Sequence, residues 1–259
     1  MRKITEETST NILMEQFIPD NVFLYVVKGA IQTFDGNKKT IFKAGDFGIA
    51  QKNRLAKYAL LESKDGFEPI IFCFDEPFLQ EFKKKHGIQP KNKAIKEAFI
   101  KLSKNQLINS FIKSIKPYYK GVMELEKEFE DVKYEELLLI LLKMKPELAE
   151  VLFDFRKPGK IDLETYMNKN FVFNVSNERF ATLTGRSLSA FKRDFKEIFD
   201  ETPSRWLVKK RLEEAHFLIE NMHQKVNDIY LDLGFESLSH FSVAFKKQFQ
   251  YTPTELTKR

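Results

Sequence analysis

Two stretches of the chain carry polar side chains whose types and spacing suit hydrogen bonding and charge pairing with an anionic partner. The sequence SLSAFKRDFKEIFDETPS occupies residues 187–204, and SLSHFSVAFKKQFQYTPT occupies residues 237–254. They align without a gap and agree at nine of eighteen positions, so they form an internal repeat. In each copy apolar residues recur at steps of three and four, which predicts two amphipathic helices with polar outer faces.

Each copy follows a short helical pattern that ends at a glycine. Ahead of the first copy, SNERFATLTG begins with Ser176, a good N-cap, and ends at Gly185, which tolerates a left-handed turn. Ahead of the second copy, NDIYLDLG begins with Asn227 as the expected cap and ends at Gly234. A short helix, a glycine turn and a second helix form a helix-turn-helix. The two predicted motifs cover about residues 176–199 and 227–249.

A longer helix is expected between the motifs. Thr202 is its expected cap, Pro203 opens it, and its apolar pattern continues to about Asn221. About 18 residues at about 1.5 Å each give a length of roughly 27 Å. Such a helix can hold two reading helices about one turn of DNA apart, in successive major grooves. The predicted partner is therefore double-stranded DNA.

The outer face of the first repeat's helix is the first candidate site. Because Leu188, Phe191 and Phe195 face inward in this pattern, the outward side chains are Ser189, Lys192, Arg193 and Lys196. The planar fork of Arg193 can bind guanine O6 and N7, and the two lysines can reach a base or a phosphate. We expect this helix to read base sequence.

The second repeat's helix offers weaker donors. Its outward side chains are Ser239, His240, Ser242 and Lys246, and Val243 stands at the position of Arg193. We therefore expect it to read sequence less sharply, through a thymine methyl group and through phosphates. The residues expected to contact phosphates in the two motifs are Arg186, Ser187, Lys196, Ser237 and Lys246.

The rest of the chain divides into a β-rich zone and a helical zone. Residues 11–74 alternate short apolar or β-branched runs with turn signals, which predicts a compact all-β unit. From Glu76 onward helical spacing takes over, and DFRKPGK at 154–160 combines proline, glycine and charge, as linkers do. The expected domains are 1–155, with a barrel at about 10–75 and helices at about 76–155, and 160–259.

Composition limits the partners and the compartment. The chain has 259 residues and a net charge of +6, which is compatible with a nucleic-acid partner but does not require one. The single cysteine, Cys73, lies in an apolar run and fits a reducing cytoplasm. The longest apolar run, residues 137–142, is too short to cross a bilayer, so we expect a cytoplasmic protein without a membrane partner.

The last hundred residues contain several specific segments: FATLTGRSLSAFKRDF, RLEEA, LGFES, HFSVAFKK and two TP pairs. Together they resemble the DNA-binding region of AraC/XylS-type transcription regulators. The resemblance implies base contacts at Ser189, Lys192, Arg193, Ser239, His240, Ser242 and Val243. Val243 departs from the family pattern, as does Tyr230, which stands where that family prefers alanine.

The front half contains LYVVKGAIQTFDG followed by FKAGDFGIA. These segments resemble the double-stranded β-helix of a cupin barrel, and KYEELLLILLKM resembles the dimerisation helices that follow such barrels in these regulators. The resemblance implies a homodimer joined through residues 122–144, with Leu138 and Leu141 as contacts; internal packing of the helix is the alternative. Metal-binding cupins use a histidine pair and a glutamate, but the only histidine before residue 200 is His86. Neither a metal nor another cofactor is expected.

The predicted fold is α+β with two domains: a cupin-like β-barrel with a helical annex, then an all-α double helix-turn-helix. The first functional hypothesis is a sequence-specific DNA-binding regulator, an activator that works with RNA polymerase and responds to a small molecule. The second is the same regulator controlled by a protein partner, as in the family's type III secretion activators, which the barrel resembles. The third, a cupin-type enzyme with a DNA-binding tail, lacks a catalytic set in the sequence, and we expect no enzyme activity.

Overall fold

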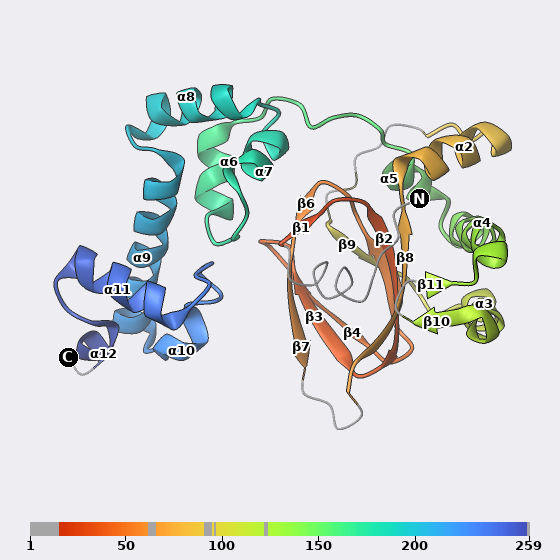
Figure 1. Cartoon of the computed structure of the whole chain (residues 1–259), viewed down its shortest axis with the longest axis horizontal. Helices are drawn as coiled ribbons and strands as arrows, with labels where there is room; N and C mark the ends of the chain where they lie inside the picture. The colour runs from red at the N-terminus through yellow and green to blue at the C-terminus, as the bar shows by residue number, and fades with distance from the viewer. Residues whose placement is uncertain (1–15, 62–65, 91–94, 96, 122–123, 258–259) are drawn as a thin grey trace. The chain divides into compact units, whose positions relative to one another are not determined.

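The computed structural model describes residues 16–61, 66–90, 95, 97–121 and 124–257 (Figure 1). The chain divides into two compact units, residues 1–156 and residues 157–259. Residues 10–15 and 62–65 of the predicted barrel lie outside the described part, as do residues 122–123 of the predicted dimer helix. The two units are described separately below.

The first unit contains two main antiparallel sheets. In chain order the strands are β1 (Phe17–Ile18), β2 (Asn21–Lys28), β3 (Ala30–Phe34), β4 (Lys39–Lys43), β5 (Phe47–Ala50), β6 (Arg54–Leu55), β7 (Lys57–Leu61), β8 (Glu68–Phe74), β9 (Phe99–Lys101), β10 (Tyr119–Gly121) and β11 (Glu124–Leu125). One sheet has the order β8-β2-β5-β9 and the other β4-β3-β7, while β1 pairs with β6 and β10 with β11. Among the described residues these strands form separate sheets, so the unit is cupin-like without being a closed barrel.

Strands β2, β3, β4, β5 and β8 confirm the β-rich zone expected at residues 11–74, but β9 corrects the expected helical zone. Strand β9 lies beyond Glu76 and pairs with β5, Ala50 opposite Phe99. A Cβ on Gly48 would lie 2.4 Å from the carbonyl oxygen of Ile100, so the close approach of β9 requires glycine there. The four-stranded sheet is thus completed by a segment from the annex.

Helices of the annex pack beside the four-stranded sheet, next to β8 (Figure 1). They are α2 (Glu76–His86), α3 (Gln106–Ile115), η1 (Lys116–Tyr118), α4 (Lys127–Met144), η2 (Pro146–Leu148) and α5 (Ala149–Leu152). Helix α2 is capped by Asp75, which accepts a hydrogen bond of 2.9 Å from the backbone N–H of Phe78. Helix α4 covers only part of the predicted dimer range 122–144, because residues 124–125 pair in β11 ahead of it.

Leu138 and Leu141, the predicted dimer contacts, are fully buried inside the first unit. They share a core with Phe72 of the sheet and Phe111 of α3. Their side chains therefore hold α4 on its own unit, which is the internal-packing alternative, and they are not available to a second copy. This corrects the assignment of these two residues; dimerisation itself remains a prediction.

All the described elements of the second unit are helices. They are α6 (Leu163–Asn170), α7 (Asn177–Leu183), α8 (Leu188–Phe199), α9 (Pro203–Met222), α10 (Val226–Ile229), α11 (Leu238–Phe249) and α12 (Pro253–Thr257). Helices α7 and α8 form the first predicted motif, α10 and α11 form the second, and α9 connects them (Figure 1). In the described part of the chain no helix has both the length and the apolarity needed to cross a membrane.

The cap of the first helix agrees with the sequence in the first motif and differs from it in the second. Ser176 caps α7 as predicted, accepting a hydrogen bond of 3.3 Å from the backbone N–H of Arg179. Asn227 is not a cap: Lys225 holds that position, without a side-chain hydrogen bond, and α10 has only four residues. The first helix of the second motif is therefore the less firmly capped.

Candidate nucleic-acid interface

The first motif places its reading helix behind a tight glycine turn. Gly185 has φ of +67°, and a Cβ there would lie 2.3 Å from the carbonyl carbon of Gly159. The hydroxyl oxygen of Ser187 caps α8 by accepting a hydrogen bond of 3.2 Å from the backbone N–H of Ala190. Its hydroxyl hydrogen remains able to donate to a phosphate oxygen at the helix N-terminus.

Helix α8 divides into a buried apolar face and an exposed polar face. Phe191 and Phe195 are fully buried and pack with Phe199 against Trp206 of α9. The structure brings the predicted side chains together on the opposite, exposed face: Ser189, Lys192, Arg193 and Lys196. Their chemistry suits hydrogen bonds to base edges and charge pairing with phosphates.

Two cations of α8 are paired with carboxylates close by in the sequence. The Nη2 atom of Arg193 lies 3.0 Å from Oδ1 of Asp194, although the Arg193 side chain is 74% exposed. The Nζ atom of Lys196 lies 2.9 Å from Oδ1 of Asp200 and 2.6 Å from its carbonyl oxygen. Lys196 holds the pKa of the Asp200 carboxyl below its ordinary value. Both cations therefore already have a carboxylate partner within the second unit.

Arg186, a predicted phosphate contact, is turned inward instead. Its side chain is only 6% exposed. The Nη1 group donates to the carbonyl oxygens of Ile161 and Thr184, at 2.9 and 2.7 Å. Its Nε group donates to Oδ2 of Asp194 at 3.1 Å. These three bonds give Arg186 a structural role in the turn, and the phosphate assignment for it is corrected.

The turn of the second motif is supported by a buried arginine. Gly234 has φ of +81°, and its carbonyl oxygen accepts a hydrogen bond of 3.0 Å from Nη1 of Arg211. Arg211 also donates to the carbonyl oxygens of Phe171 and Phe173, at 2.7 and 2.8 Å. Burial lowers the pKa of Arg211 to about 10, so it stays charged at neutral pH. Within the basic run of residues 209–211, Arg211 is therefore buried while Lys209 is exposed.

Helix α11 presents a face of hydroxyl, imidazole and basic groups. Ser239, His240 and Lys246 are exposed, Ser242 is half-buried, and Val243 is 70% exposed. The hydroxyl oxygen of Ser237 caps the helix by accepting a hydrogen bond of 3.2 Å from the backbone N–H of His240. Unlike α8, the sequence of α11 contains no carboxylate. This face can attract phosphates without competition from within its own helix.

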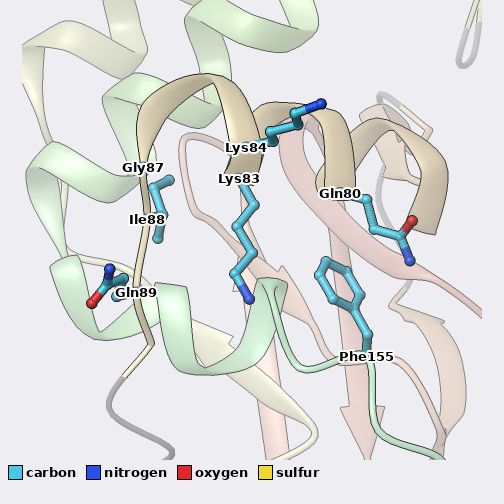
Figure 2. Close-up of a pocket in the computed structure, with 7 residues that line it drawn as sticks. All are labelled: Gln80, Lys83, Lys84, Gly87, Ile88, Gln89 and Phe155. Carbon is cyan, nitrogen blue, oxygen red and sulfur yellow. The ribbon is translucent and has the colours of Figure 1, made fainter.

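The first unit carries a shallow groove of about 430 Å³ at the C-terminal end of α2 (Figure 2). It is lined by Gln80, Lys83, Lys84, Gly87, Ile88, Gln89 and Phe155. Figure 2 shows Lys83 directed toward Phe155 and Lys84 directed away. The Nζ atoms of Lys83 and Lys52 lie 5.5 and 5.3 Å from the centre of the Phe155 ring. Nothing in the sequence singled out this groove.

Apolar side chains from both sheets form a buried cluster among the described residues. Val26 and Ile31 are fully buried there, and Phe42 is 2% exposed. Metal binding needs a cluster of suitable donors, and within the described residues no three His, Cys, Asp or Glu side chains are placed to hold an ion.

Comparison with known families matches both units. Residues 21–151 match the family described as the ExsA N-terminal regulatory domain, which is half of the chain. Residues 180–259 match the family described as a helix-turn-helix domain, and this region contains both motifs.

Individual relatives are similar over part of their length. The virulence regulon transcriptional activator VirF of Yersinia enterocolitica is 31% identical over 128 residues, covering 48% of this chain and 47% of VirF. The regulator ExsA of Pseudomonas aeruginosa is 28% identical over 125 residues, covering 48% of this chain and 45% of ExsA. A crystal structure of ToxT from Vibrio cholerae is 15% identical, with a TM-score of 0.43 over 94% of this chain and 90% of ToxT. The chain spans about half the length of the curated relatives it matches.

Proposed function

The chain belongs to the AraC/XylS family of transcription regulators, with an ExsA-type N-terminal regulatory domain, and from this premise we propose that it is a sequence-specific DNA-binding activator. One observation carries the proposal. Two helix-turn-helix motifs, joined by α9, each expose polar side chains on the second helix while burying its phenylalanines. This arrangement suits two successive major grooves of one duplex.

The contacts divide between the two motifs. Arg193 is the principal base reader of the first motif, supported by Ser189 and Lys192. The base contacts proposed for the second motif are Ser239, His240, Ser242 and Val243. The phosphate contacts proposed for both motifs are Ser187, Lys196, Ser237 and Lys246.

RNA polymerase is the second proposed partner, because an activator bound to DNA must recruit or stimulate the enzyme that transcribes it. The similarity to VirF, named as a transcriptional activator, supports activation over repression. Both partners place the protein in the cytoplasm.

Control is assigned to the first unit, which matches a regulatory-domain family. A small anionic molecule is the first candidate effector, because the groove is lined by the aromatic ring of Phe155 and by the amine of Lys83. A protein partner is the second candidate, favoured by the match of the first unit to the ExsA regulatory-domain family and by the resemblance of its barrel to that of the family's type III secretion activators. Thermal-shift measurements with a small-molecule panel would favour the first candidate if a compound stabilises the chain and Phe155→Ala abolishes the effect.

A homodimer is proposed through the outer face of α4. Val132 and Leu139 are 63% and 45% exposed and lie two helical turns apart. Sedimentation of the wild type and of Val132→Glu with Leu139→Glu tests this contact. A dimer that becomes a folded monomer supports it, and a wild-type monomer contradicts it.

Selection of DNA from a randomised library by the full chain tests the proposed function. We expect one preferred site with two recognised segments about one helical turn apart. The matched control is Arg193→Ala, which should recover a site with weaker preference at one segment. Recovery of random sequence by the folded wild type would contradict the proposal.

A further inference from the structure

We infer that Asp194 is a positioning residue for base recognition, which holds the guanidinium of Arg193 in the orientation that reads DNA. This inference deepens the proposed function and rests on it, because it presumes that Arg193 reads a base. Its structural basis is a chain of contacts that starts near the beginning of the second unit and ends at the exposed arginine.

The two oxygens of the Asp194 carboxylate have different partners. Oδ1 accepts a hydrogen bond of 3.0 Å from Nη2 of Arg193. Oδ2 accepts one of 3.1 Å from Nε of Arg186, and the Nζ of Lys160 lies 3.5 Å from the same oxygen. The carboxylate therefore connects a buried guanidinium to an exposed one. Hydrogen bonds from Arg186 and then Arg193 hold the pKa of Asp194 below its ordinary value.

Arg186 is the fixed end of this chain of contacts. Its buried guanidinium is held by the carbonyl oxygens of Ile161 and Thr184. The backbone of Gly159 lies directly against Gly185, where a Cβ would come within 2.3 Å. Because an arginine held by three acceptors has little freedom, the carboxylate that it grips is fixed as well.

An exposed arginine gains the most from such support. Its side chain loses much rotamer freedom when it binds, and a guanine edge accepts only a well-aligned pair of N–H groups. Asp194 uses one N–H of Nη2 and leaves the other donors of Arg193 for a base. The negative charge of Asp194 also opposes phosphates near the reading face, so it weakens binding to DNA in general.

The second motif lacks this device. Val243 and Ala244 occupy the positions of Arg193 and Asp194, and Glu236 occupies the position of Arg186. Because residue 244 carries no carboxylate, none of the contacts that Asp194 makes in the first motif can form there. The arrangement is therefore confined to the motif to which we assign sharp base reading.

The test compares Asp194→Ala with Glu197→Ala in the full chain. Both variants remove one carboxylate from α8, but only Asp194 contacts Arg193 in the structure. Affinities are measured for the selected site, for each single-base variant of it and for random DNA. For Asp194→Ala we expect discrimination at one base position to fall about tenfold, while Glu197→Ala keeps it. In the Arg193→Ala background, Asp194→Ala should have no further effect on discrimination.

Several outcomes would overturn the inference. One is that Asp194→Ala and Glu197→Ala change the affinity for all DNA sequences equally. Asp194 would then affect binding only through its negative charge. Another is an undiminished effect of Asp194→Ala when Arg193 is absent. If Arg193→Ala discriminates bases as well as the wild type, the assignment of the reader itself fails. If the alanine variant does not fold, Asp194→Asn replaces it in the test, because the asparagine keeps an acceptor for Arg186. An unchanged base preference in that variant would contradict the inference.

Discussion

The two helix-turn-helix motifs share a frame and differ in the chemistry placed on it. Phe191, Phe195 and Phe199 of α8 form the same series of tilted ring contacts as the phenylalanines fifty residues later in α11. On the outer faces, however, Arg193 is paired with a carboxylate, whereas α11 contains no carboxylate at all. The repeated residues thus build the fold, and the residues that differ decide what each motif can recognise.

The glycine turns of the two motifs are also supported differently. Gly185 lies against the backbone of Gly159, near the start of the second unit. Gly234 lies against Arg211, whose guanidinium binds three carbonyl oxygens within the second unit. The turn of the first motif therefore depends on close backbone packing against Gly159, while the turn of the second motif depends on the buried side chain of Arg211.

The largest expected effect comes from removing the brace of the second motif. Arg211→Met leaves three carbonyl oxygens without their donor, which should cost about 3 to 5 kcal/mol of unfolding free energy. Denaturant unfolding followed by the single tryptophan, Trp206, measures this change. Lys209→Met is the control, because Lys209 is exposed and should change stability little. A similar cost for both variants would contradict the bracing role.

A smaller loss is expected at the turn of the first motif. Gly185→Ala forces a left-handed alanine and places its Cβ against the backbone of Gly159, for about 2 to 4 kcal/mol. The matched control is Gly159→Ala, since a Cβ there meets nothing within 4 Å. The same Trp206 unfolding measurement compares them, and equal stability of the two variants would show that the contact at Gly185 is dispensable.

Placing the arginine and the aspartate of the first motif at the equivalent positions of α11 tests whether these two residues account for the difference between the motifs. Val243→Arg adds a cation to an exposed position without a supporting carboxylate, so it should raise affinity for all DNA sequences by about threefold or more. Adding Ala244→Asp should reduce this general gain and create a preference at one base position. Titrations on single-base variants check both effects. A new base preference from Val243→Arg alone would show that the neighbouring carboxylate is not needed.

The smallest expected effects concern the two equivalent lysines. Lys196→Ala and Lys246→Ala should each weaken binding to all DNA sequences alike. Each should also reduce the slope of log affinity against log salt concentration by about one, because one phosphate contact is lost. The loss should be smaller for Lys196, because DNA must first separate it from Asp200, 2.9 Å away. Affinities at two or more salt concentrations measure both slopes. A base-specific loss from either variant would contradict its assignment to a phosphate.

Much of the second unit could be predicted because its helices are specified locally. The three-and-four spacing of phenylalanines and the caps at Ser176, Ser187 and Ser237 lie within a few residues of the helices they define. The exposed faces of α8 and α11 follow from the same spacing. Their roles in binding remain predictions.

The features that could not be predicted depend on distant partners. Strand β9 is only three residues long, and its pairing with β5 is set about fifty residues away. The burial of Arg211 depends on backbone carbonyls, which have no signature in the sequence. A leucine-rich helix has the same apolar pattern whether it packs in a core or at a dimer contact. The sequence therefore predicts a dimer contact at Leu138 and Leu141, which is wrong because both are buried in the core.

Equilibrium titration of Arg193→Ala and Val243→Ala on the selected site and its single-base variants, at two salt concentrations, tests the central claim most directly. We expect Arg193→Ala to lose about 1 to 3 kcal/mol on the selected site and to relax preference at one base position. We expect Val243→Ala to change both quantities less. If instead Arg193→Ala weakens every sequence equally while Val243→Ala shifts base preference, the roles assigned to the two motifs are reversed.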